Sequence, residues 1–315
     1  MSKDAVTQAS APGRIILFGE HGVDHGGPAI ALAVDIRARC NVQVSPKFTV
    51  NGEDLDTRRH SHLRGAILNG WSDMDTPLAI TTETDIPPEL GMGGLAAGTV
   101  ACLGAISMLN DHIIFEHVAR NAFLAHCEVE ADCSPLDSSV STHGGCIMAD
   151  RRASGGNIWS FKANKNTWHI REIETPEMEL VLGYSGTPSP TLEMRNKVLR
   201  FIQRNSFARD IISDIHRIVD DGRSALASGD LAEIGRAMND NHRLLVNLGV
   251  STPALESMVK AAARHSHGVK ITGTGGGGCI VALAREPEKV VSAIESAGGE
   301  AFRLTISREG LRPDD

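Results

Sequence analysis

Two glycine-rich segments offer the backbone groups that bind an anion. The first consists of Gly91, Met92, Gly93, Gly94, Leu95, Ala96 and Ala97. A run of small and apolar residues follows it as far as Met108 and predicts a buried helix. A glycine loop that opens onto a helix presents backbone N–H groups and the positive end of the helix dipole to an anion. The segment therefore predicts a phosphate-binding loop, although a glycine turn needed only for packing has the same pattern.

The second segment places five glycines, Gly273 and Gly275 to Gly278, within six residues and before the strand candidate Cys279–Leu283. Missing side chains let the backbone approach a bulky ligand closely. Consecutive glycines cost conformational entropy unless they serve a purpose. We therefore expect Gly273, Gly275 and Gly276 to shape a ligand cleft. Neither segment continues into Gly-Lys-Ser/Thr or fits a strand-turn-helix dinucleotide fingerprint, which excludes the P-loop and Rossmann classes.

Charged residues near glycine or proline are the candidates for chemistry. The stretch from Gly13 to Gly27 contains Arg14, Glu20 and His21. Asp137 follows Pro135, and because proline disfavours helical geometry before it, we expect Asp137 in an exposed turn. On its own, each of these residues has an ordinary structural interpretation, as a turn former or a buried polar group.

The elements that must position these residues alternate between strands and helices. The strand candidates are 14–18, 28–34, 140–148, 179–183 and 279–283, and the helix candidates are 95–108, 114–130, 210–226, 231–245 and 253–265. This order predicts an α+β protein with two domains. The polar stretch 151–166 places their boundary, so we expect an N-terminal domain at 1–170 and a C-terminal domain at 171–315.

The composition narrows the class of protein. With 315 residues, 41% of them hydrophobic, the chain can bury a sizeable core. The net charge of -8 argues against a general nucleic-acid binder. The six cysteines form no C-x-x-C pair, so we expect reduced thiols and a cytoplasmic protein. We find no signal-peptide pattern and no run of about 18 or more apolar residues, so we expect no membrane span.

Three motifs resemble those of the GHMP kinases in order and separation: Ala11–His21, Gly91–Ala97 and Lys270–Cys279. Within that superfamily, Ser134–Gly145 and Met238–Pro253 are most similar to the mevalonate kinases. The match covers nearly the whole chain, and the helix that ends in Leu-Gly-Val-Ser-Thr-Pro253 is the best discriminator.

The resemblance implies a ribosomal protein S5 domain 2-like N-terminal domain and a ferredoxin-like C-terminal domain. ATP and mevalonate would bind in the cleft between them, with Mg²⁺, and the chain would often form a homodimer. Asp137 matches the catalytic aspartate, which orients or deprotonates the accepting hydroxyl. Glu20 and His21 match the stretch that lines the mevalonate pocket. The Gly91–Ala97 loop would hold the phosphates of ATP.

The chain departs from the family pattern at catalytic positions. Arg14 stands where the family has a lysine, and its permanent charge can stabilise Asp137 as a carboxylate but cannot readily shuttle protons. Gly94 and Leu95 replace paired serines, which removes the hydroxyl expected to help ligate Mg²⁺ and preserves the backbone N–H groups.

The expected metal carboxylate is also replaced. Counting back from Asp137, the usual Mg²⁺-binding glutamate falls on His126, a poor ligand for a hard cation. Glu128 or Glu130 would take its place after a small shift in register. The sequence leaves both open.

Three interpretations follow. The chain is a divergent kinase that phosphorylates mevalonate, a sister kinase that acts on a phosphorylated mevalonate, or a regulatory protein that binds nucleotide or mevalonate without turnover. Extra anion-binding residues would mark the second, and Arg195 and Lys197 are the candidates. Retention of Asp137 favours an enzyme, because a carboxylate near the γ-phosphate repels a nucleotide that is merely bound.

Overall fold

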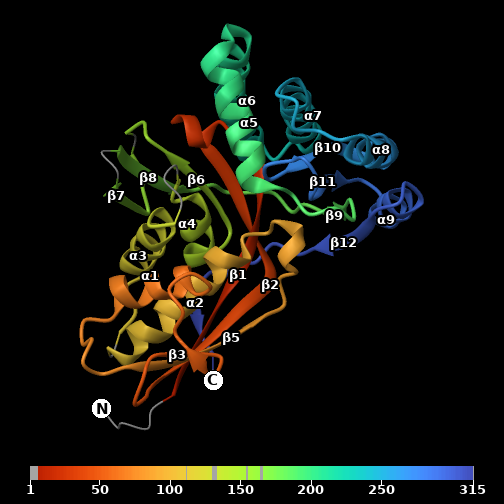
Figure 1. Ribbon diagram of the computed structural model, residues 1–315. Coiled ribbons are helices and arrows are strands. Elements are labelled where there is room, and N and C mark those ends of the chain that lie inside the picture. Colours follow the sequence, from red (N-terminus) through yellow and green to blue (C-terminus); the bar gives the residue numbers. More distant parts are fainter. Residues whose placement is uncertain (1–5, 111, 130–132, 154, 164–165, 315) are drawn as a thin grey trace.

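Two β-sheets, both largely antiparallel, form the framework of the molecule. The computed structural model describes residues 6–110, 112–129, 133–153, 155–163 and 166–314. The first sheet has the strand order β4-β3-β5-β2-β6-β8-β7, and β1 lies beside β2 and β13. The second has the order β10-β11-β9-β12. In Figure 1 the first sheet runs down the molecule and the second lies beside its upper part. The α+β class is therefore confirmed.

The bounds of the elements are as follows. The first sheet contains β1 (Thr7–Phe18), β2 (Ala29–Val44), β3 (Thr49–Val50), β4 (Glu53–Asp54), β5 (Leu78–Thr84), β6 (Cys146–Asp150), β7 (Trp159–Ala163), β8 (Asn166–Glu172) and β13 (Arg312–Pro313). The second contains β9 (Leu180–Tyr184), β10 (Ser266–Thr272), β11 (Cys279–Ala284) and β12 (Glu300–Leu304). The helices are α1 (Ser61–Gly70), α2 (Gly94–Leu109), α3 (Phe115–Cys127), α4 (Leu136–His143), α5 (Thr191–Arg204), α6 (Ser206–Ser228), α7 (Leu231–Asn247), α8 (Pro253–Ala262) and α9 (Pro287–Ser296).

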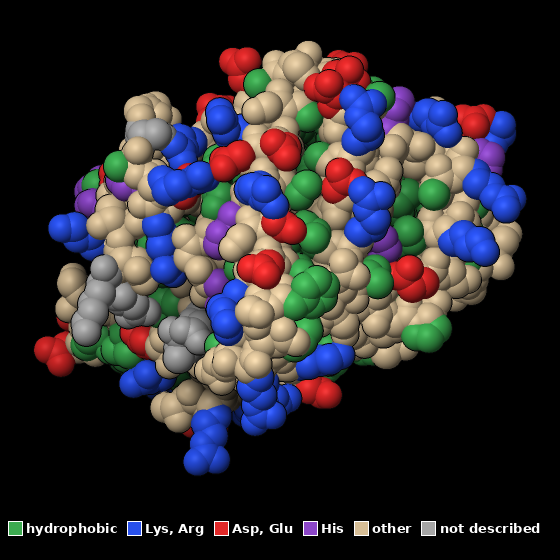
Figure 2. Space-filling view, turned by 90° about the horizontal axis from the view of Figure 1, so that it is seen from above, with side chains coloured by type: hydrophobic (Ala, Val, Ile, Leu, Met, Phe, Trp, Pro, Cys, Tyr) green, Lys and Arg blue, Asp and Glu red, His purple; other side chains and the backbone are tan. Residues whose placement is uncertain are grey.

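Helix α2 is the centre of the first half. Its small residues are buried on nearly every side, so it packs closely against β1 and β2 while α1, α3 and α4 pack around it. In the second half α7 lies along β10, and α8 and α9 cover the second sheet. None of the helices in the described part of the chain is both long and apolar enough to cross a membrane. Acidic and basic side chains are interspersed on the face seen in Figure 2.

The region around Asp137 differs from the expectation. The predicted strand at 140–148 is wrong over its first part, since α4 occupies Leu136–His143, and right only from Cys146, where β6 begins. Asp137 therefore lies in the first turn of a helix and not in an exposed turn. Pro135 stands at the N-cap, where its missing N–H costs nothing, so it begins α4 as well as ending what precedes it.

The expectation of six reduced thiols is wrong for two of them. Cys127 at the end of α3 and Cys133 before α4 form a disulfide, with their Cα atoms 5.6 Å apart. The short segment between two packed helices brings them together, which a search for C-x-x-C spacing does not detect. The disulfide ties the end of α3 to the residues that lead into Asp137.

The end of the chain returns to the first sheet. Strand β13 pairs with β1, and Ser307 N donates to Ala33 O at 3.0 Å. The buried side chain of Arg37 on β2 holds this return in place, donating to Ser10 O at 3.0 Å and Gly310 O at 2.6 Å. The division at 170/171 stays a prediction, and a single cut there leaves β13 apart from the sheet that it joins.

Replacing Arg37 by Met tests this connection. We expect the free energy of unfolding to fall by about 2–4 kcal/mol, because buried carbonyl groups lose charged donors. The matched control is Arg39→Met on the same strand, whose exposed pair with Asp85 contributes less than about 1 kcal/mol. Urea denaturation measures both. Equal losses in the two variants would show that the C-terminal return does not depend on Arg37.

Candidate active site

A cleft of about 610 Å³ lies where the two sheets meet, and it gathers most of the predicted site residues. Those that line it are Arg14, Glu20, His21, Gly91, Met92, Gly93, Gly94, Leu95, Ala96, Asp137 and Gly273. Ala97 is fully buried in the first turn of α2. Residues separated by more than 250 positions in the sequence thus meet in one cavity.

The glycine loop before α2 has the geometry of an anion site. Gly91 and Gly93 have φ angles of 65° and 74°, a left-handed backbone that side chains disfavour. The first intrahelical bond runs from Ala97 N to Gly93 O at 2.9 Å. The N–H groups of residues 93 to 96 therefore precede the helical ladder, and these residues line the cleft. Together with the helix dipole they suit a phosphate.

Arg14 and Asp137 form a bidentate ion pair on one wall of the cleft. Arg14 Nε lies 2.7 Å from Asp137 Oδ1, and Nη2 lies 2.5 Å from Oδ2. The third nitrogen, Nη1, donates to Gly91 O at 2.6 Å. Burial raises the pKa of the Asp137 carboxyl, but the charge and hydrogen bonds of Arg14 outweigh it, so the pKa lies below its ordinary value. Asp137 is thus an oriented carboxylate.

Glu20 lines the cleft, but its carboxylate forms an ion pair with a lysine of the second sheet. Its Oε1 contacts the ammonium group of Lys270 on β10, and both side chains are almost fully buried. Lys270 also donates to Ile271 O at 2.7 Å. Lys270 begins one of the three motifs identified in the sequence, but no function was predicted for it. The signal was a lysine inside an apolar strand, where a charge needs a partner.

His21 has an unusual backbone conformation. Its φ angle is 60°, and its Nε2 lies 3.1 Å from Thr274 O in the second glycine segment. Burial lowers the pKa of His21 to about 4, so the imidazole is neutral near pH 7. The contact with Thr274 joins the loop after β1 to the loop after β10.

The second glycine segment approaches neighbouring backbone closely. A Cβ atom on Gly275 would lie 2.3 Å from Val250 O, and one on Gly276 would lie 2.7 Å from Met194 Sδ. Gly276 N donates to Val250 O at 2.7 Å. Gly273 lines the cleft, while Gly275 and Gly276 pack behind it against α5 and the turn after α7.

An ion pair that sequence reasoning missed lies on another wall. Arg195 Nη2 on α5 is 3.0 Å from Asp24 Oδ1, and both residues line the cleft. Arg195 is close enough to influence the pKa values of His21 and Asp137. Lys197, its proposed companion, contacts Gly249 O beyond the cleft. A basic residue two positions along a helix points elsewhere, which explains why the two separate.

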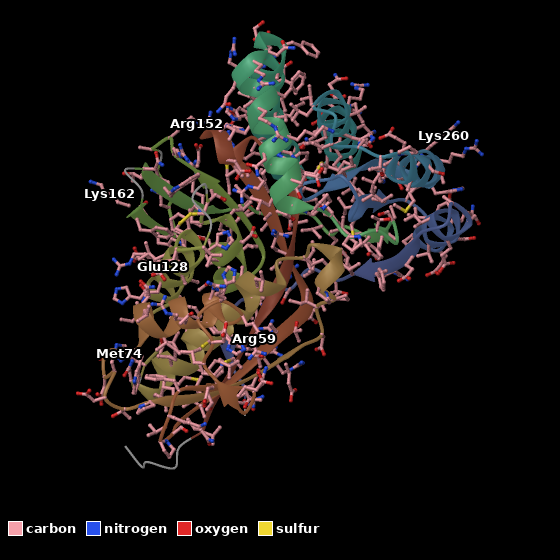
Figure 3. All side chains as sticks on the ribbon, in the orientation of Figure 1. Arg59, Met74, Glu128, Arg152, Lys162 and Lys260 are labelled. Atoms are coloured by element: carbon pink, nitrogen blue, oxygen red, sulfur yellow. A yellow bond between two sulfur atoms is a disulfide. The ribbon has the colours of Figure 1, made fainter. Side chains whose placement is uncertain are left out.

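The donor groups of the cleft do not fit a magnesium ion held by side chains. Glu128 lies at the surface (Figure 3), where its Oε1 accepts a hydrogen bond from Asn69 Nδ2 at 3.1 Å, and Glu130 lies outside the described residues. The carboxylates of Asp137, Glu20 and Asp24 are each paired with a cation. No group of three metal-ligating side chains occurs among the residues with a described position.

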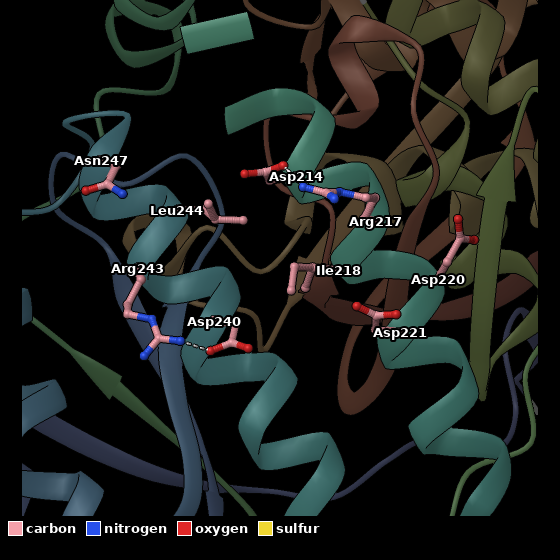
Figure 4. Close-up of a pocket in the computed structure, with 9 residues that line it drawn as sticks. All are labelled: Asp214, Arg217, Ile218, Asp220, Asp221, Asp240, Arg243, Leu244 and Asn247. Atoms are coloured by element: carbon pink, nitrogen blue, oxygen red, sulfur yellow. Dashed lines mark hydrogen bonds and ion pairs between the residues drawn. The ribbon is translucent and has the colours of Figure 1, made fainter. Parts of the chain in front are cut away.

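A second cavity of about 680 Å³ lies between α6 and α7 (Figure 4). Its walls carry the ion pairs Arg217–Asp214 and Arg243–Asp240, each formed within one helix. Exposed pairs of this kind contribute little to stability or binding. Most of the candidate site residues line the first cleft instead.

Comparison with known proteins agrees with this geometry. The family model described as GHMP kinases N terminal domain matches residues 61–145, and the model described as GHMP kinases C terminal matches residues 223–303. A mevalonate kinase of Thermococcus sibiricus is 32% identical over 342 aligned positions, which cover 98% of each chain.

Solved structures share the fold. The mevalonate kinase of Methanococcus jannaschii superposes with a TM-score of 0.77 at 22% identity, covering 96% of this chain and 99% of that one. The L. major mevalonate kinase in complex with R-mevalonate gives 0.75 at 24% identity, covering 94% of each. The two-domain fold expected from the motifs is confirmed. With both family models matched and a relative at 32% identity along nearly its whole length, this chain belongs to the GHMP kinases, in the family of the mevalonate kinases.

Proposed function

We propose that this chain transfers the γ-phosphoryl group of ATP to the primary hydroxyl of mevalonate, a step of isoprenoid synthesis. The observation that carries the proposal is the Arg14–Asp137 pair, which shares a cleft with the anion-binding loop at the start of α2. Its relatives of 32% identity named mevalonate kinase support the choice of acceptor.

Phosphoryl transfer depends mainly on position and charge. In the proposed reaction the N–H groups at the start of α2 hold the phosphates of ATP. Asp137 accepts a hydrogen bond from the substrate hydroxyl and orients its oxygen toward the γ-phosphorus. Because Arg14 lowers the pKa of Asp137, this carboxylate takes up the hydroxyl proton late, as the oxygen–phosphorus bond forms. Arg14 stabilises negative charge and transfers no proton.

The acceptor occupies the side of the cleft with His21 and Arg195. Because neutral His21 donates its Nε2–H to Thr274 O, its Nδ1 is an acceptor and can take a hydrogen bond from a hydroxyl of mevalonate. Arg195 brings positive charge to the substrate carboxylate. Glu20 acts indirectly, because its carboxylate contacts Lys270.

The proposal includes Mg²⁺ as a companion of ATP, bound through the nucleotide phosphates. A homodimer remains a prediction carried over from the resemblance, and a cytoplasmic location remains a prediction from the cysteine pattern. Of the two residues suggested for a phosphorylated acceptor, Arg195 lines the cleft and Lys197 lies beyond it. This placement favours mevalonate over a phosphomevalonate.

A substrate panel tests the proposed reaction. The purified chain is offered ATP and Mg²⁺ with mevalonate, 3-phosphomevalonate or 5-phosphomevalonate, and ADP release is followed by a coupled assay. We expect turnover with mevalonate alone. Turnover confined to a phosphomevalonate would move the function to a sister step, and nucleotide binding without turnover would leave a regulatory protein.

Asp137→Asn keeps the size of the side chain and removes its charge. We expect kcat to fall by about 10³-fold with KM for ATP little changed, because the hydroxyl loses its oriented acceptor. Steady-state kinetics with mevalonate measure the effect. Asp85→Asn, which removes an exposed carboxylate, is the control and should match the parent. Parental turnover by Asp137→Asn would refute the catalytic assignment.

His21 makes stability depend on pH. The folded pKa of about 4 lies below the ordinary 6.5, so the unfolded chain binds the proton first as pH falls. The folded state therefore loses stability between pH 6.5 and about 4, amounting to about 2 kcal/mol from pH 7 to pH 5.

His21→Asn removes this group and tolerates the left-handed backbone. We expect the free energy of unfolding of the variant to fall by about 2 kcal/mol less than that of the parent over the same pH range. Urea denaturation at pH 7 and pH 5 measures the difference. Identical pH dependence in the two proteins would mean that His21 is not buried as a neutral imidazole.

A further inference from the structure

We infer that this chain binds the phosphates of its nucleotide directly, with His126 as one of their contacts, and leaves the divalent cation to the nucleotide. The inference rests on the proposed function, because it assumes that ATP occupies the cleft. Three features of the cleft carry it: an apolar residue in the first turn of α2, carboxylates that are already paired, and an imidazole where the family has a carboxylate.

The first feature is Leu95. Its side chain is 67% exposed, although it lies in the first turn of α2 and lines the cleft. An exposed leucine offers no oxygen to a hard cation, which prefers oxygen ligands. The backbone N–H of the same residue remains available to a phosphate oxygen. This end of the loop therefore suits the anion and not its metal.

The second feature is the pairing of the acidic groups. Asp137 shares both oxygens with Arg14, and Asp24 accepts from Arg195 at 3.0 Å. Glu20 contacts Lys270 in a buried pair. A carboxylate engaged by a cation is a weaker ligand for a second cation, because part of its charge and its lone pairs is already used. The carboxylates described in the cleft are thus paired with arginine and lysine side chains of the protein itself.

The third feature is His126 in the last turn of α3, which lines the cleft together with Asp137 and Leu95. Its ring stacks on that of His62 from α1, with centroids 5.6 Å apart. Its neighbour Cys127 is tied to Cys133, which lines the same cleft. The ring of His126 is therefore held by His62, and the end of its helix is held by the disulfide. An imidazole can donate an N–H to a phosphate oxygen, whereas a carboxylate would repel it.

Binding measurements with and without metal test the inference. Isothermal titration calorimetry follows the non-hydrolysable ATP analogue AMP-PNP binding to the whole chain, in EDTA and in excess Mg²⁺. We expect the two dissociation constants to differ by less than about tenfold. Electron paramagnetic resonance of Mn²⁺ should show the ion bound by the protein–AMP-PNP complex within about threefold of its affinity for AMP-PNP alone.

Variants make the contact with His126 specific. His126→Glu should weaken metal-free AMP-PNP binding by about tenfold or more, and combining it with Leu95→Ser should tighten Mn²⁺ binding in the complex by a similar factor. The matched control is His117→Glu, an exposed histidine near the start of the same helix and outside the cleft lining, which should change AMP-PNP binding by less than about threefold. Glu130→Gln should leave Mn²⁺ binding unchanged.

The outcomes separate this inference from the proposed function. Binding of AMP-PNP only in the presence of Mg²⁺, or loss of Mn²⁺ affinity in Glu130→Gln, would overturn the inference while ATP keeps its place in the cleft. Equal effects of His126→Glu and His117→Glu would overturn the contact with His126. Failure of AMP-PNP to bind under either condition would overturn both the inference and the proposed function.

Discussion

The buried ion pair between Glu20 and Lys270 is the constraint on which the cleft depends. Glu20 follows β1 of the first sheet, and Lys270 belongs to β10 of the second. Burial raises the pKa of Glu20 and lowers that of Lys270, and the main interaction that opposes both shifts is the one between the two residues. Removing one partner would leave the other charge unpaired in the protein interior. The two sheets must therefore keep this register, and the adjacent contact of His21 with Thr274 follows from it.

The same register sets the position of Arg14. Strand β1, which ends two residues before Glu20, also carries Arg14, whose backbone N–H donates to Met92 O at 2.8 Å and whose side chain donates to Gly91 O. Strand β1 thus fixes the phosphate loop from both backbone and side chain. The loop in turn begins α2, and Arg14 turns its remaining nitrogens to Asp137 on α4. One strand aligns the phosphate loop, the carboxylate and the link to the second sheet.

How far the sequence could predict this arrangement depends on the range of the interactions. Glycines with a required backbone, and apolar runs beside them, are local signals, so the helix predicted at 95–108 lies at Gly94–Leu109, directly after the glycine loop. Asp137 was singled out from the sequence and lies in the cleft, but its helix was missed because Pro135 has the same signature at the end of one helix and the beginning of another. The return of β13 through Arg37 joins positions more than 250 residues apart, and such contacts leave no local pattern.

The substitutions at Arg14, Leu95 and His126 are best understood together. A guanidinium can bond both oxygens of Asp137 and the Gly91 carbonyl at once, which the single ammonium of a lysine cannot do in a planar fork. In the proposed reaction the guanidinium of Arg14 supplies positive charge, and the ring of His126 supplies an N–H donor, where phosphate charge develops. Loss of the hydroxyl at residue 95 then costs less, because fewer functions fall to a metal held by the protein. In the proposed reaction the three departures shift the stabilisation of phosphate charge from a metal held by the protein to the protein's own side chains. The backbone of α2 and Asp137 then position donor and acceptor in line.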